Sequence, residues 1–175
     1  MSWRMAIYRL PAEPSRHRVA VWRELRKVGA VSLQQATWAI PSGPAFDAAL
    51  ARAAAVVQRA DGQVLCLAVA ADDPQIADLE QMFTAEREAE WTEFLRECDK
   101  FDAELAHEIE IEKFTLAELD EEEHNLDRLR RWYRDLRTKD LFGAASAPIA
   151  EYRLKECTER LEEFAERVYQ ARERP

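Results

Sequence analysis

The sequence predicts an α+β protein in which a βαββαβ half is followed by an antiparallel helical hairpin or bundle. Three observations predict this class. Short apolar runs alternate with two helix-like patterns over residues 1–71, no convincing strand pattern follows residue 74, and residues 85–175 repeat apolar side chains at helical spacing. The 175 residues are 47% hydrophobic and include only 4 glycines, so a packed core is expected rather than disorder.

The first half contains four strand patterns and two helix patterns. Pro41-Ser42-Gly43-Pro44 and Asp61-Gly62 break the chain on either side of the second helix. The order strand, helix, strand, strand, helix, strand is the split βαβ, ferredoxin-like arrangement. The strands are expected at Met5–Leu10, Ala30–Leu33, Thr37–Ile40 and Val64–Ala70, and the helices at Ser15–Val28 and Ala45–Arg59.

The last of these strands differs from the others because it is apolar on both faces. An antiparallel sheet with helices on one side only should have a strand that alternates apolar and polar residues. Val64–Ala70 does not alternate. Its second face is therefore expected to be covered by the second half of the chain or by a partner subunit, and a homodimer is predicted.

The second half begins at Asp72-Asp73-Pro74, which divides the chain into an α/β module (1–71) and a long-helix bundle packed on it (72–175). A first long helix is expected at about Ala85–Lys113. Thr115 and Glu118 form a capping box that starts a second, and a third begins near Ser146. The apolar residues of the three helices share one seam, which is typical of antiparallel bundles.

Charge is divided unevenly along the sequence. Residues 1–71 carry nine arginines and lysines against four acidic residues, a net charge of +5, whereas the remainder has a net charge of −14. The overall charge of −9 disfavours non-specific binding to nucleic acid, but the local field decides each contact. Because residues 1–71 are basic although the remainder is acidic, the sequence does not exclude nucleic-acid binding by the first half.

Cysteine and hydropathy patterns restrict the environment of the protein. Cys66, Cys98 and Cys157 stand alone, without a CxxC pair, which predicts neither a disulfide framework nor a zinc site. No apolar run has the length of a membrane span, and the N-terminus lacks a signal-peptide pattern. A cytoplasmic protein without membrane contact is expected.

The first helix carries the candidate binding site. Ser15 is the expected N-cap, Val19, Trp22, Leu25 and Val28 recur at helical spacing, and cations occupy the first turn. The helix dipole disfavours cations there, but free backbone N–H groups favour an anion, so a bound phosphate or oxyanion would offset the cost. The expected ligands are Ser15, Arg16, Arg18, Arg23, Arg26 and Lys27, with Arg4 and Arg9 assisting. Alternatively, these arginines pair with Glu24 or with acids of the second half.

Two Glu-x-x-His pairs have the spacing found in di-iron bundle sites: Glu104 with His107, and Glu121 with His124. The helical angle places both pairs away from the apolar seam, so no metal site is expected. The sequence has no phosphate-binding loop, no dinucleotide glycine motif and no G-x-S-x-G or HExxH motif. Neither an enzyme nor a cofactor is expected.

Three segments resemble one known family. Leu10-Pro-Ala-Glu-Pro-Ser-Arg-His-Arg-Val-Ala-Val-Trp-Arg-Glu-Leu-Arg-Lys-Val-Gly-Ala-Val31, Thr37-Trp-Ala-Ile-Pro41 and Leu129-Arg-Arg-Trp-Tyr-Arg-Asp-Leu-Arg-Thr-Lys-Asp-Leu-Phe-Gly143 are similar to the N-terminal region of ChrB, the chromate-resistance regulator. The first seventy residues also resemble the ferredoxin-like module of PaaX-type repressors and of CRISPR-associated endoribonuclease-like proteins. The nuclease members hold metal with an Asp after the first strand. Leu10-Pro-Ala-Glu13 lacks it, so nuclease activity is not implied.

The resemblance implies a bacterial regulatory protein tied to the chromate response. Two ligands then fit the basic helix: DNA phosphates, or a tetrahedral oxyanion such as chromate or sulfate. The alternative is a non-enzymatic protein-interaction scaffold that does not bind nucleic acid.

Overall fold

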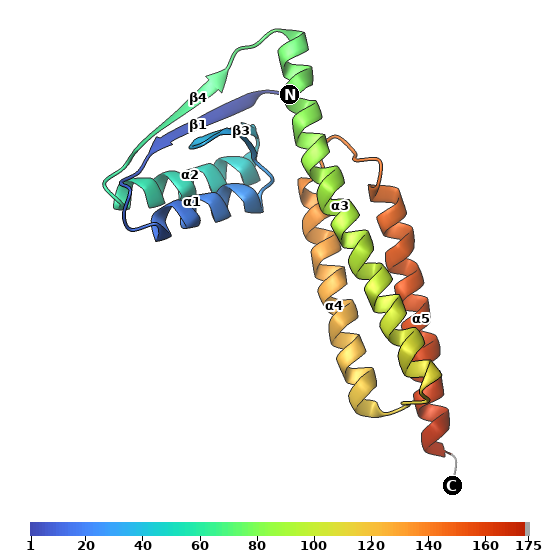
Figure 1. Cartoon of the computed structure of the whole chain (residues 1–175). Helices are drawn as coiled ribbons and strands as arrows, with labels where there is room; N and C mark the ends of the chain where they lie inside the picture. Colours follow the sequence, from blue (N-terminus) through green and yellow to red (C-terminus); the bar gives the residue numbers. More distant parts are fainter. Residues whose placement is uncertain (174–175) are drawn as a thin grey trace. The chain divides into compact units, whose positions relative to one another are not determined.

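The computed structural model describes residues 1–173. Contacts between residues divide the chain into two compact units, Met1–Glu86 and a second unit that begins at Arg87. The first contains a four-stranded sheet with two helices, and the second contains three long helices (Figure 1). The predicted α+β class, with strands concentrated in the first half, is confirmed.

The sheet of the first unit is antiparallel throughout and has the strand order β2-β3-β1-β4. This confirms the predicted ferredoxin-like order of elements. The central strand β1 pairs Met5 with Ala39 on one side and with Leu67 on the other. The strands are β1 (Trp3–Arg9), β2 (Val31–Gln34), β3 (Thr37–Pro41) and β4 (Gln63–Val69).

Helices α1 (Arg16–Lys27) and α2 (Pro44–Arg59) pack side by side on one side of the sheet (Figure 1). The buried residues of α2 recur at helical spacing and form one apolar stripe: Phe46, Ala49, Leu50, Ala53 and Val57. On α1, however, the buried residues are Val21 and Leu25, while Val19 and Trp22 are 42% and 46% exposed. The predicted apolar stripe of α1 is therefore wrong for two of its members.

Strand β4 lies at one edge of the sheet. Its apolar pattern predicts that its outer face is covered, but the single chain leaves this face exposed. Leu65 and Leu67, which share one face of the strand, are 60% and 47% exposed, and Cys66 on the opposite face is also exposed. Antiparallel sheets tolerate one solvated face, but such a face is usually polar.

Helix α3 (Asp73–Glu110) begins twelve residues before the expected start at Ala85. Asp72 explains the earlier start, because its Oδ1 accepts a hydrogen bond from the backbone N–H of Gln75 at 3.1 Å. Pro74 occupies the first turn, where its missing N–H costs nothing. Contacts between residues place the boundary of the two compact units inside this helix, after Glu86.

The second unit is completed by α4 (Leu116–Lys139) and α5 (Ala147–Glu173). The predicted capping box forms, because the Thr115 hydroxyl accepts a hydrogen bond from the N–H of Glu118 at 3.2 Å. The expected seam is the core of this unit, and its fully buried members include Trp91, Phe94 and Phe164. Among residues 1–173, no helix is long and apolar enough to cross a membrane.

Candidate functional site: the basic outer face of α1

The cations predicted on α1 all lie on its outer face. Arg16, Arg18, Arg23, Arg26 and Lys27 are exposed, and none has an ion-pair partner within the described part of the chain. Glu24, the acid expected to compete for them, instead accepts from Arg52 Nε at 2.8 Å. We call these five side chains the α1 cations.

Ser15 occupies the N-cap position of α1 but does not act as a cap. Its backbone is in the helical region, at φ −61° and ψ −21°, and its side chain makes no capping hydrogen bond. Within the first turn, the N–H of His17 donates weakly to Pro14 O at 3.4 Å and that of Val19 donates to Ser15 O at 3.2 Å. The Ser15 hydroxyl therefore stays available beside Arg16 and Arg18.

The two cations expected to assist from the first strand lie in different surroundings. Arg4 Nε pairs with Asp47 Oδ1 at 3.0 Å, so its charge is already compensated. Arg9 is exposed at the end of β1, where it lines a shallow hollow with Asp61 and Gly62. Neither adds a free cation to the outer face of α1.

A hollow of about 470 Å³ lies beside the α1 cations, and sequence reasoning missed it. Trp22 forms one wall, and Arg26 holds its guanidinium carbon 5.5 Å from the centre of the Trp22 ring. We call this hollow the Trp22 pocket; its lining comes from α1, β1 and the β2–β3 hairpin and includes Tyr8, Arg18, Val19, Gln35 and Trp38.

The sequence contained a signal for this pocket. Arg18, Trp22 and Arg26 are spaced four residues apart, which places them along one stripe of a helix. An aromatic residue between two arginines on one stripe belongs to the solvent face. Val21 and Leu25, also four residues apart, provide the alternative apolar stripe, and this is the stripe that the fold buries.

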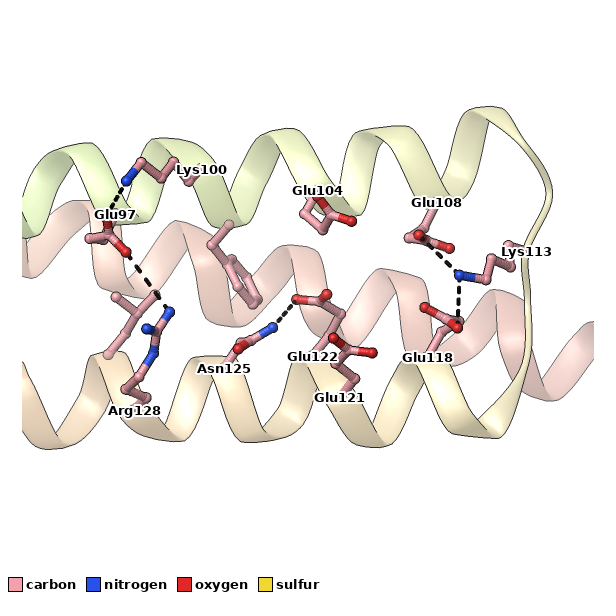
Figure 2. Close-up of a pocket in the computed structure, with 12 residues that line it drawn as sticks. Glu97, Lys100, Glu104, Glu108, Lys113, Glu118, Glu121, Glu122, Asn125 and Arg128 are labelled. Atoms are coloured by element: carbon pink, nitrogen blue, oxygen red, sulfur yellow. Dashed lines mark hydrogen bonds and ion pairs between the residues drawn. The ribbon is translucent and has the colours of Figure 1, made fainter.

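The four residues with metal-site spacing are not brought together. Glu104 and Glu121 face each other across a groove between α3 and α4, as Figure 2 shows, but His107 and His124 do not line it. His124 is exposed and its Nδ1 lies 2.5 Å from the backbone oxygen of Asp120. Over residues 1–173, no three His, Cys, Asp or Glu side chains are grouped so that they could hold a metal ion.

Three cations, Lys100, Lys113 and Arg128, compensate part of the charge of the six glutamates that line the acidic groove. Lys113, in the loop between α3 and α4, lies 2.8 Å from Glu118 Oε1 and 3.5 Å from Glu108 Oε1 (Figure 2). Glu122 is 3% exposed, and its burial raises the pKa of its carboxyl group against the opposing hydrogen bond from Asn125. These contacts give the groove a structural role between the two helices.

Comparison with known proteins identifies the family of the chain. The family model described as "Protein ChrB, N-terminal" matches residues 18–175. Protein ChrB of Cupriavidus metallidurans is 30% identical over 117 residues, which cover 66% of this chain and 36% of that relative. The match thus spans about a third of the relative's length, and no solved structure matches significantly. Because the family model covers most of the sequence, the chain belongs to the ChrB N-terminal family.

Proposed function

We propose that this chain is a regulatory module of bacterial chromate resistance that binds nucleic acid through the α1 cations. The observation that supports it most is their lack of acidic partners. Elsewhere in the first unit, Arg4 and Arg52 each pair with a carboxylate. Exposed cations gathered on one helix face, without compensation, repel each other until an anion lies across them.

Phosphate contacts of this kind give affinity but little sequence preference. Arginine forms bidentate pairs with phosphate oxygens and is also able to read guanine in a major groove. The overall charge of −9 disfavours non-specific contact, so binding is expected where cations are gathered without acidic partners, as on α1. The chromate connection follows from family membership and not from the geometry of this helix.

The test is binding of labelled duplex DNA, taken from upstream of the protein's own gene, measured by fluorescence anisotropy between 50 and 200 mM salt. We expect affinity to fall linearly on a log–log plot against salt. Arg16→Ala with Arg18→Ala should weaken binding several-fold and make the slope shallower by about 1.8, because each phosphate contact contributes about 0.9. The matched control is Arg167→Ala with Arg172→Ala, which removes two exposed cations from α5. No binding at low salt, or equal effects of the two pairs, contradicts the proposal.

A second candidate function is oxyanion sensing, which the geometry of Ser15 favours. Its hydroxyl is not engaged in capping and lies at the positive end of the helix dipole, beside two arginines. Thermal unfolding with chromate, sulfate and a neutral solute tests this function. A rise in melting temperature with either anion, abolished by Arg18→Ala, supports it. If neither DNA nor anion binds, the alternative of a protein-interaction scaffold remains.

We also propose a homodimer through the outer face of β4. The exposed Leu65 and Leu67 form an apolar surface on the edge strand of the sheet. Proteins usually protect exposed apolar edge strands from pairing with another chain. Sedimentation equilibrium should give twice the chain mass for the wild type and the chain mass for Leu65→Lys with Leu67→Lys. A wild-type monomer at micromolar concentration would contradict it.

A further inference from the structure

We propose that the Trp22 pocket takes an unpaired base of a nucleic-acid strand whose phosphates lie along the α1 cations. This proposal rests on the proposed function and specifies it further, because it predicts a preference for single-stranded over duplex nucleic acid. Exposed aromatic side chains that stand within a positively charged groove are the usual stacking platforms for bases in single strands.

Trp22 has the properties of such a platform. Its side chain is 46% exposed although its neighbours Val21 and Leu25 are buried. Arg26 lies over the ring at 5.5 Å, and this contact holds the indole in place at the edge of the pocket. Stacking tolerates any base, because every base offers a π face.

A second observation comes from the floor of the pocket. Trp38 is only 5% exposed and lines the pocket, yet its indole Nε1 has no hydrogen-bond acceptor among residues 1–173. A buried donor without an acceptor is unfavourable, and most buried indole N–H groups are paired. Bases carry carbonyl and ring-nitrogen acceptors on their edges, so a base bound in the pocket brings such acceptors next to the Trp38 side chain.

The charge around the pocket points to a strand as the occupant. Arg18 lines the pocket itself, and Arg26 stands at the Trp22 ring. The α1 cations continue in both directions from there, from Arg16 to Lys27, which covers about 16 Å of helix. One nucleotide does not extend over that distance, whereas successive phosphates of a strand do. The pocket volume of about 470 Å³ lies within the range of small-molecule sites and accommodates one base.

The test compares three labelled probes with the full chain at 50 mM salt: a twelve-residue oligodeoxyadenylate, a strand of equal phosphate number without bases, and a duplex of equal length. Wild-type protein should bind the base-bearing strand about tenfold more tightly than the strand without bases, since stacking has effects of this size. Trp22→Ala should bring this ratio close to one, mainly by weakening binding of the base-bearing strand. Trp22→Phe should restore most of the ratio, because phenylalanine keeps an aromatic face.

The matched control is Tyr152→Ala, which removes an exposed aromatic side chain from α5 in the second unit. It should leave all three affinities at the wild-type values. Equal binding of the strands with and without bases overturns the inference and leaves the phosphate contacts of the proposed function standing. Tighter binding of the duplex, or an unchanged ratio in Trp22→Ala, also overturns it. If no probe binds wild-type protein, the inference and the proposed function both fail.

Discussion

Two groups of charges in this protein, one in each unit, differ in whether the fold compensates them. In the helical unit, Arg153 contacts Asp99 Oδ1 at 2.9 Å and also pairs with Asp102 and Glu156, while Lys139 lies 3.0 Å from Glu90. On α1 of the α/β unit, the α1 cations have no such partners in the described residues. Charges that are compensated within the fold stabilise it, whereas uncompensated charges are available to a ligand. Removing a compensated charge should therefore reduce stability, whereas removing an uncompensated charge should reduce ligand binding.

The largest effect is expected from Arg153→Ala. The substitution leaves Asp102, a residue that is 7% exposed, with Arg160 at 3.7 Å as its only cation among residues 1–173. Removing one partner of a largely buried pair leaves a desolvated charge behind, and we expect a loss of about 2 kcal/mol in the free energy of unfolding. Urea denaturation measures it. Lys155→Ala, which breaks an exposed pair with Glu159 at 3.6 Å, is the control and should change stability by less than about 0.5 kcal/mol.

For the α1 cations we expect the opposite change in the free energy of unfolding. Arg16 and Arg18 lie in the first turn of the helix, where the dipole disfavours cations, and neither has a compensating acid in residues 1–173. Arg16→Ala with Arg18→Ala should raise the free energy of unfolding by about 0.5 kcal/mol while it weakens ligand binding. Arg167→Ala with Arg172→Ala removes a cation from the last turn of α5 and should not stabilise the protein. A double variant of α1 that is strongly destabilised would mean that these cations do have a structural role.

A smaller, pH-dependent effect is expected at Glu122. Burial, with the nearby charges of Glu104 and Glu121, raises the pKa of its carboxyl group above the ordinary 4.5, so the folded state holds the proton more tightly than the unfolded state. The stability contributed by this proton is complete below pH 4.5 and is lost as the pH rises through the folded-state pKa. Glu122→Gln should therefore be more stable than wild type at pH 7, and the difference should shrink towards pH 4.5. The exposed Glu123→Gln should show no such dependence; equal profiles would contradict the assignment.

The smallest expected difference between the two units concerns the reactivity of their cysteine thiols. Cys98 and Cys157 are fully buried, and the pKa of the Cys157 thiol is raised by its contact with Cys98 and by burial. Cys66 on β4 is exposed, although partial desolvation raises the pKa of its thiol as well. A thiol reagent should therefore modify one cysteine in the native protein, slowly at neutral pH, and all three in urea. Modification of more than one native thiol would mean that the helical unit opens readily.

Local signals in the sequence predicted most of the fold, because strong turns and caps fix where elements start and end. Thr115 with Glu118 and the Asp61-Gly62 turn are examples. The start of α3 was missed although Ile76, Leu79 and Phe83 recur at helical spacing, because the cap at Asp72 was not identified. The face of α1 was misread because two apolar stripes are present and only packing on the sheet selects between them. The α1 cations were predicted from sequence, but the pocket beside them required the β2–β3 hairpin to be in place.

The exposure of Trp22 also makes the protein its own optical probe. The other four tryptophans are buried or partly buried, so a small polar quencher such as iodide should reach the indole on α1 in preference to the rest. The accessible fraction of the intrinsic emission then reports on one defined place in the molecule. Any compound that binds at Trp22 will protect its fluorescence from the quencher, so binding can be followed without a label on either partner.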